Sequence, residues 1–315
     1  MKFERNVVLY EDDIIVLHGF LKGSLGRPVL VIPPHAGRHG NITQNLIDSL
    51  SNLRQTYAIE LKPALPDNER VDVSRLVEKI AGCVKIIKQQ NDFRTIDLAG
   101  ACMGGWLSTI YTSLYQENIN RLALFASPIN TKTGKKNSIE DYCKIINLDF
   151  HRMIVKMNNG IQPGYMQWCA FAISNPIPVF LGRYVDLYNH IADGDLPKVK
   201  RWIKNNAWYD QPIDLDGTWF LEALEKHFVN NELYDGTWEI CGKKVTLANI
   251  TCPVFVYTGK NDEITHSEQG RAILDKVSST EKHYTDFPDA GHTAVFVRGS
   301  CIDKFIDDFY VREIL

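Results

Sequence analysis

The sequence lacks the features that mark several specialised classes of protein. It has no apolar run long enough to span a bilayer, no basic and apolar leader at its start, and no cysteine pair spaced C-x-x-C. These absences argue against a membrane-spanning protein, a secreted protein and a zinc site. We therefore expect a cytoplasmic protein that needs no metal and no cofactor.

The chain also lacks a large excess of charge of either sign. Its 35 Lys and Arg residues oppose 38 Asp and Glu residues, which gives a formal net charge of -3. Such a balance disfavours non-specific binding to nucleic acid. The seven cysteines are an odd number at scattered positions, as expected for reduced thiols and not for a disulfide framework. At 315 residues, 44% of them hydrophobic, the chain is long enough to bury a large core.

Cys102 is the most informative residue of the chain. It lies in Gly-Ala-Cys-Met-Gly-Gly, residues 100–105, after the strand-like run 95–99 and before apolar residues at helical spacing. This order is typical of a nucleophile elbow, whose sharp strand-to-helix turn requires small residues around the nucleophile. The helix N-terminus would favour a thiolate there. The alternative is a cysteine that simply fills the core as a small apolar residue.

An elbow nucleophile needs an acid and a histidine farther along the chain. Asp262 follows the apolar run 254–258, and His292 lies beside a glycine in a loop before the last predicted helix, around residues 302–309. Alone, Asp262 could be a turn residue and His292 a helix cap. Together with Cys102 they have the chain order of a catalytic triad, which predicts these three residues as the catalytic ones.

The same scheme requires an oxyanion hole. One donor would be the backbone N–H of Met103, directly after the nucleophile. The second would come from the loop 33–40, which follows the buried strand predicted at 29–32, with Ala36 as the first choice and His35 as the neighbouring alternative. His35 and His39 could instead form a metal pair, but no carboxylate or cysteine completes a recognisable site.

Strand and helix patterns alternate along most of the chain and predict an α/β fold, a mostly parallel sheet with helices on both faces. The alternation stops at about residue 131 and resumes after 248. We therefore predict an α/β-hydrolase core from 1–130 and 249–315, with 131–248 inserted as a largely helical lid. Before the insertion, the predicted elements are a hairpin of 7–10 with 14–17, helices around 42–53, 76–87 and 106–114, and strands 57–60 and 122–126.

The predicted lid holds five of the six tryptophans: Trp168, Trp202, Trp208, Trp219 and Trp238. Aromatic lids shelter apolar acyl groups and exclude water. The alternative is that most of these side chains form the core of the lid itself.

The chain resembles the polyhydroxyalkanoate synthases, especially their shorter catalytic subunits, over nearly its whole length after about the first 25 residues. Four stretches carry the resemblance: the elbow 100–105, Phe-Ala-Ser-Pro-Ile-Asn at 125–130, Val-Asp-Leu-Tyr at 185–188 with Arg-Trp-Ile at 201–203, and the run 245–254. The resemblance implies an α/β-hydrolase core, (R)-3-hydroxyacyl-CoA substrates, and Cys102, His292 and Asp262 as nucleophile, base and acid. It also implies a second, non-catalytic subunit, or a homodimer, as the partner.

The chain departs from the synthase pattern in three places. Glu263 follows the predicted acid where the synthases usually have histidine, Glu60-Leu61 stands where Asp-Trp is common, and the loop Pro-Pro-His-Ala-Gly at 33–37 is closer to that of intracellular polyhydroxyalkanoate depolymerases. Three functions therefore remain open. The first is an acyltransferase that builds a polyester from hydroxyacyl-CoA, and the second is a hydrolase, either a depolymerase, an esterase or a thioesterase, on the same acyl class. The third is a catalytically silent homologue that binds granules or a partner.

Overall fold

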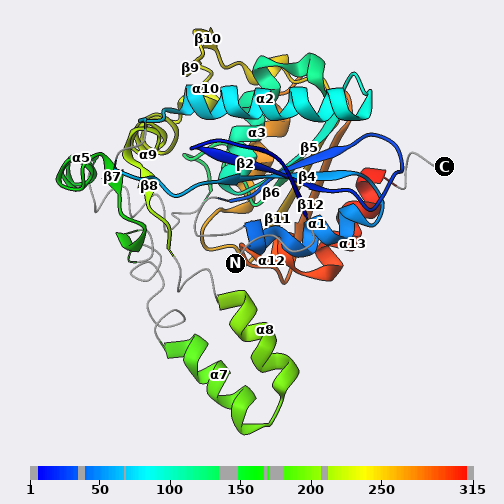
Figure 1. Ribbon diagram of the computed structural model, residues 1–315, viewed down its shortest axis with the longest axis vertical. Helices are drawn as coiled ribbons and strands as arrows, with labels where there is room; N and C mark the ends of the chain where they lie inside the picture. Colours follow the sequence, from blue (N-terminus) through cyan, green and yellow to red (C-terminus); the bar gives the residue numbers. More distant parts are fainter. Residues whose placement is uncertain are drawn as a thin grey trace.

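The computed structural model describes residues 6–34, 40–66, 69–134, 148–166, 169, 181–206 and 212–310. An eight-stranded sheet crosses the molecule in the order β1-β2-β4-β3-β5-β6-β11-β12 (Figure 1). Both antiparallel pairings involve β2, and all the other neighbours run parallel. The strands are β1 (Val7–Glu11), β2 (Ile15–Phe20), β3 (Val29–Ile32), β4 (Thr56–Leu61), β5 (Ile96–Ala101), β6 (Ile119–Phe125), β11 (Val254–Gly259) and β12 (Lys282–Phe287).

Helices cover both faces of this sheet, with α2 and α3 on one side and α1, α12 and α13 on the other (Figure 1). The fold therefore has three layers, and it confirms the predicted α/β class. No helix among the described residues combines the length and apolarity needed to cross a bilayer. The core helices are α1 (Gln44–Ser51), α2 (Val73–Asn91), α3 (Met103–Leu114), α11 (Ser267–Arg271), α12 (Ala294–Val297) and α13 (Gly299–Tyr310).

Local sequence explains these elements. The central strands β3, β5 and β11 are buried along their whole length, as expected for apolar strands with helices on both faces. The helix α2 buries one stripe of residues three or four apart. It begins where the Asp72 side chain accepts a hydrogen bond from the Arg75 N–H at 2.7 Å, and it ends at Asp92 in the left-handed conformation.

The segment predicted as a lid contains helices and short strands: α5 (Leu148–Met157), β7 (Ile161–Gln162), α7 (Arg183–Ala192), α8 (Leu196–Asn206), β8 (Leu215–Asp216), α9 (Gly217–Glu222), a π-helix (Ala223–Val229), α10 (Glu232–Asp235), β9 (Glu239–Ile240) and β10 (Lys243–Lys244). Trp219 and Trp238 are buried in the same cluster as the side chains of α2 and α3. These two tryptophans therefore serve as core. Trp168 and Trp208 lie outside the described residues.

His227, in the π-helix, joins this segment to the loop after β6. Its ring is fully buried next to Trp106, with ring centroids 5.2 Å apart, and its Nε2 donates to the Pro128 carbonyl at 3.0 Å. Farther along, Asn231 Oδ1 accepts from the Thr131 N–H at 2.9 Å. The π-helix is thus fixed to the backbone that leaves the sheet beside the predicted nucleophile.

We predict that His227 makes the fold sensitive to acid. Burial lowers the pKa of its imidazole from 6.5 to about 3, although the hydrogen bond to Pro128 acts in the opposite direction. Between these pH values the unfolded chain binds the proton and the folded chain does not, so the free energy of unfolding should fall by about 1.4 kcal/mol per pH unit on acidification. Chemical denaturation from pH 7 to pH 4 measures this slope.

In His227→Phe that component of the slope should be absent. The variant His283→Gln keeps His227 and should keep the slope. An unchanged slope in His227→Phe would show that other groups cause the acid sensitivity.

Candidate active site

Cys102 lies at the turn between β5 and α3. The strand ends at Ala101, the helix begins at Met103, and Cys102 between them has φ 50° and ψ -113°. A positive φ is unusual for a residue other than glycine and is tolerated where surrounding contacts enforce it. Here the Cys102 N–H donates to the Phe125 carbonyl at 2.8 Å, and the Cys102 carbonyl accepts from the Gly105 N–H at 3.0 Å. The predicted elbow is therefore present, with its thiol half-buried.

Three glycines are needed at this turn, because neighbouring atoms occupy the space that a side chain at each of these positions would fill. A Cβ on Gly100 would lie 2.5 Å from the Gly104 carbonyl oxygen. One on Gly104 would lie 1.9 Å from the carbonyl oxygen of Ile32, at the end of β3, and one on Gly105 would lie 1.7 Å from Ser127 Oγ. The helix α3 can therefore approach the ends of β3 and β6 only because these positions carry no side chain.

The structure brings Asp262 and His292 together across 30 residues of chain. Asp262 follows β11, and its Oδ2 accepts from His292 Nδ1 at 2.8 Å. Its Oδ1 accepts from the backbone N–H groups of Ile264 and Thr265, each at 2.8 Å. Because the carboxylate is fully buried and accepts all three bonds, its orientation toward the imidazole is fixed.

Cys102 is close enough to His292 for its sulfur to influence the pKa of the imidazole. Burial lowers the pKa of His292, but the Asp262 carboxylate and the Cys102 sulfur raise it, and the resulting pKa lies well above 6.5. The arrangement can hold a proton on the imidazole between a carboxylate and a sulfur atom. Nucleophilic catalysis by cysteine needs a base that reaches the nucleophile and is oriented by a third group, and here Asp262 orients His292.

The predicted oxyanion hole is described only in part. Met103 is the first residue of α3, where backbone N–H groups have no partner within the helix. Ala36, His35 and His39 lie outside the described residues, so the second donor and the alternative metal pair stay predictions. Within the described ranges, no three His, Cys, Asp or Glu side chains are grouped so that they could hold a metal ion.

The loop after β6 is a part of the site that residue patterns alone did not identify. Ala126 has φ 45° and its N–H donates to the Tyr257 carbonyl at 2.9 Å. Ser127 then fills the space beside Gly105, and the N–H groups of Ile129 and Asn130 donate to Gln269 of α11. In the sequence, the run 125–130 stands out only by its resemblance to the synthases, since contacts between separate strands leave no local periodicity.

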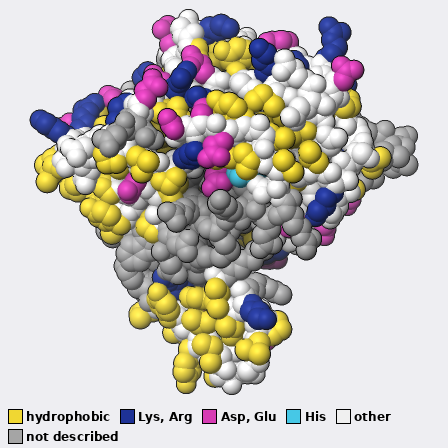
Figure 2. Space-filling model, viewed as in Figure 1, with side chains coloured by type: hydrophobic (Ala, Val, Ile, Leu, Met, Phe, Trp, Pro, Cys, Tyr) yellow, Lys and Arg dark blue, Asp and Glu magenta, His cyan; other side chains and the backbone are white. Residues whose placement is uncertain are grey.

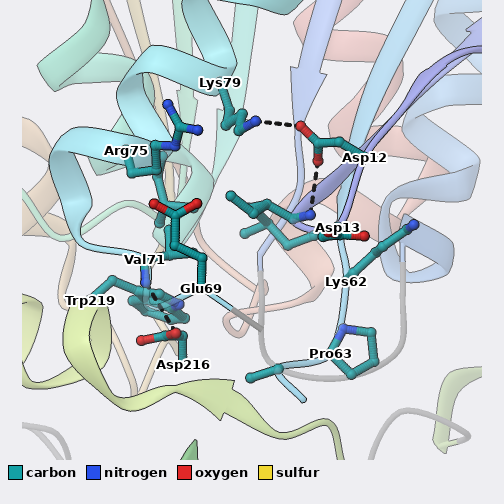
Figure 3. A pocket seen from close by; sticks show the side chains of 14 residues that line it. Asp12, Asp13, Lys62, Pro63, Glu69, Val71, Arg75, Lys79, Asp216 and Trp219 are labelled. Carbon is teal, nitrogen blue, oxygen red and sulfur yellow. Dashed lines mark hydrogen bonds and ion pairs between the residues drawn. The ribbon is translucent and has the colours of Figure 1, made fainter. Parts of the chain in front are cut away.

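A polar cavity of about 200 Å³ opens at the same edge of the sheet (Figure 3). It lies between the turn at Asp12, the residues after β4, the start of α2, and Trp219 of α9. Lys79 forms an ion pair with Asp12 (Figure 3). Burial raises the pKa of the Asp12 carboxyl. Hydrogen bonds from Lys79 and from two backbone N–H groups have the larger combined effect, so the pKa lies well below its ordinary value. None of the predicted catalytic residues lines this cavity.

Comparison with known protein families identifies the family of this chain. A family model described as the C-terminus of PHB de-polymerase matches residues 126–311, more than half of the chain. The chain belongs to this family. The matched region includes the loop after β6, Asp262 and His292, whereas Cys102 precedes it.

Curated relatives agree with the resemblance to polyhydroxyalkanoate synthases. The poly(3-hydroxyalkanoate) polymerase subunit PhaC of Allochromatium vinosum is 26% identical over 217 residues, which cover 69% of this chain and 59% of that protein. PhaC of Haloarcula marismortui is also 26% identical, over 45% of its length. The chain thus spans about half the length of these two proteins. PhaC of Synechocystis is 23% identical over 94% of this chain and 81% of its own.

Solved structures share the fold. A hydrolase from Pseudomonas aeruginosa superposes with a TM-score of 0.60 at 14% identity, covering 98% of this chain and 99% of that one. A thermophilic esterase from Thermogutta terrifontis gives 0.59 at 16% identity, with 98% of both chains covered. Together with the strand order, these likenesses confirm the predicted α/β-hydrolase fold.

We predict that Gly105→Ala destabilises the protein by about 1 to 3 kcal/mol, because its methyl group would overlap Ser127. Gly82→Ala is the matched control, since a Cβ there, also in a helix, meets nothing within 4 Å. It should stabilise by about 0.5 to 1 kcal/mol. Urea denaturation measures the free energy of unfolding of both variants.

The double variant Gly105→Ala/Ser127→Gly should recover part of the stability lost in Gly105→Ala. Equal effects of Gly105→Ala and Gly82→Ala would contradict the close approach of Gly105 to Ser127.

A second prediction concerns the charge on His292. Asp262→Asn removes a carboxylate that raises the pKa of His292, so that pKa should fall, as followed by NMR of the imidazole Cε1–H. Because the folded pKa lies above the unfolded one, the imidazolium stabilises the fold below pH 6.5, and this contribution is lost as pH rises through the folded value.

The variant Asp289→Asn removes an exposed carboxylate near His292 in sequence and should leave its titration unchanged. If the titration of His292 is the same in Asp262→Asn as in the unmodified chain, the ion pair does not control it.

Proposed function

We propose that the chain is an acyltransferase of the polyhydroxyalkanoate-synthase type, in which Cys102 is the nucleophile, His292 the general base and Asp262 the residue that orients it. The observation that carries the proposal is a cysteine at the strand-to-helix turn, near a histidine that is itself held by a buried carboxylate. The polymerase names of the PhaC relatives support the acyl class, and we infer (R)-3-hydroxyacyl-CoA as the substrate.

The first step is attack of the Cys102 sulfur on the thioester carbonyl of the substrate. His292 holds the proton from Cys102 and gives it to the departing CoA sulfur, while the N–H of Met103 stabilises the oxyanion. A backbone donor of this kind typically contributes about 10²–10³ in rate. The product is a thioester between the acyl group and Cys102. One thioester has replaced another, so the acyl group stays activated.

In the second step a 3-hydroxyl group attacks this acyl-enzyme. His292 takes the hydroxyl proton, the new ester forms, and the Cys102 sulfur leaves. Water competes with the hydroxyl, and we infer that residues 131–248 form the lid that excludes it. The proposal includes a cytoplasmic location, where acyl-CoA is available, and a second subunit or a second copy as partner.

Hydrolysis of the same acyl class is the second candidate. The description of the family model, which names a de-polymerase, favours it. The same three residues would act, with water in place of the 3-hydroxyl in the second step. The two functions therefore differ in what reaches the acyl-enzyme and not in how it forms.

Intact-protein mass spectrometry after mixing with (R)-3-hydroxybutyryl-CoA tests the proposal. We expect a ladder of acyl units on the unmodified chain and none on Cys102→Ala. Release of CoA with free monomeric acid and no ladder would favour the hydrolase and overturn the polymerase for this substrate.

Cys252→Ala is the matched control, because it removes a buried thiol far from His292 in sequence. Burial raises the pKa of Cys252 to about 11, so it stays a thiol at neutral pH. It should keep the ladder. Acylation of Cys102→Ala at the same rate as the unmodified chain would refute the assignment of the nucleophile.

A further inference from the structure

The helices α7 and α8 form a hairpin at one end of the molecule, apart from the sheet and its covering helices (Figure 1). Figure 2 shows hydrophobic side chains gathered over this lobe. Tyr188 is 70% exposed and Leu196 67% exposed. The others at least half exposed are Leu181, Tyr184, Val185, Ile191 and Ile203. Single exposed apolar residues are common, but so many within 26 residues indicate an interaction surface.

The hairpin is held together by contacts that use Tyr184 of this surface, whose ring packs against Trp202 with centroids 6.1 Å apart. The indole Nε1 of Trp202, in α8, donates to the Arg183 carbonyl, at the start of α7, at 2.8 Å. In α7, Tyr184, Tyr188 and Ile191 follow each other at spacings of four and three residues, so they lie along one face of the helix. We name the exposed apolar residues of 181–203 the hairpin face.

The hairpin differs from the rest of the chain in the sign of its net charge. Residues 181–206 contain five Lys or Arg and three Asp, a net charge of +2. Since the whole chain carries -3, the remainder carries -5. Lys198 and Lys200 are exposed on α8, and Lys198 Nζ lies 2.9 Å from Oδ2 of Asp195, the residue just before that helix. The apolar surface is therefore accompanied by positive charge on an otherwise acidic molecule.

We propose that the hairpin face docks on an anionic lipid surface. Amphipathic helices with apolar residues on one face and Lys or Arg on the other lie in the headgroup region of bilayers, where cations meet lipid phosphates. A second copy of the hairpin would bring two positively charged lobes together and is disfavoured by like-charge repulsion. This inference does not depend on the chemistry of Cys102.

Vesicle co-sedimentation of the full chain tests the proposal. We expect binding to vesicles of phosphatidylcholine mixed with phosphatidylglycerol, weaker binding to phosphatidylcholine alone, and loss of the difference at high salt. Each cation near an anionic bilayer contributes about fivefold in affinity. Lys198→Gln/Lys200→Gln should therefore bind anionic vesicles at least about tenfold more weakly, whereas Lys243→Gln/Lys244→Gln, at the opposite end of the molecule (Figure 1), should bind as the unmodified chain does.

The apolar part is tested with Tyr188→Ser/Ile191→Ser/Leu196→Ser, against Leu21→Ser/Leu25→Ser as exposed controls elsewhere in the chain. Circular dichroism and the melting temperature establish that each variant is folded. The proposal predicts at least about tenfold weaker vesicle binding for the hairpin variant alone. The proposal is overturned if the unmodified chain does not bind vesicles, or if all variants bind them equally. It is also overturned if the unmodified chain is a dimer that binds no vesicles and the hairpin variant is a monomer.

Discussion

The site depends on the direct approach of α3 to the ends of two strands. At Gly104 the helix backbone lies so close to the carbonyl of Ile32 that no Cβ fits, and at Gly105 the same holds for the Ser127 side chain. Because α3 is fixed against β3 and β6 in this way, Cys102 adopts a positive φ and its side chain leaves the sheet at the carboxyl edge. The position of the thiol is thus a consequence of backbone packing.

Asp262 and His292 are positioned by a second close backbone contact, at the ends of the neighbouring strands β11 and β12. A Cβ on Gly259 would lie 2.3 Å from the Ala290 carbonyl oxygen, and that oxygen accepts from the Asn261 N–H at 3.0 Å. The loops after β11 and β12 are therefore joined just before each provides its functional residue. Asp262 and His292 are thus brought together by backbone contacts between the two loops that carry them.

The spacing of apolar residues along the sequence predicted those strands and helices in which such residues recur regularly. The buried apolar runs of β3 and β11 and the helical spacing of α2 were visible in the sequence. The edge strand β12 was missed, since Lys282–Phe287 is polar and only partly buried, without the apolar signal of a central strand. The order of the motifs predicted that Asp262 and His292 lie together, and these two side chains do meet. It could not predict the contacts of His227 with Pro128, because that pairing joins residues 99 apart through tertiary packing.

The π-helix at Ala223–Val229 has a consequence for how this segment tolerates changes of length. A π-helical turn contains one residue more than an α-helical turn, and each residue of an α-helix advances by about 100° around the axis. Each π-helical residue therefore advances by less than 100°, so deleting a single residue there and restoring α-helical winding would leave the direction of the chain beyond it nearly unchanged. Asn231 would then still face Thr131, its partner in the loop after β6. The π-helix thus allows this segment to lose one residue while the junction formed by His227 and Asn231 is kept.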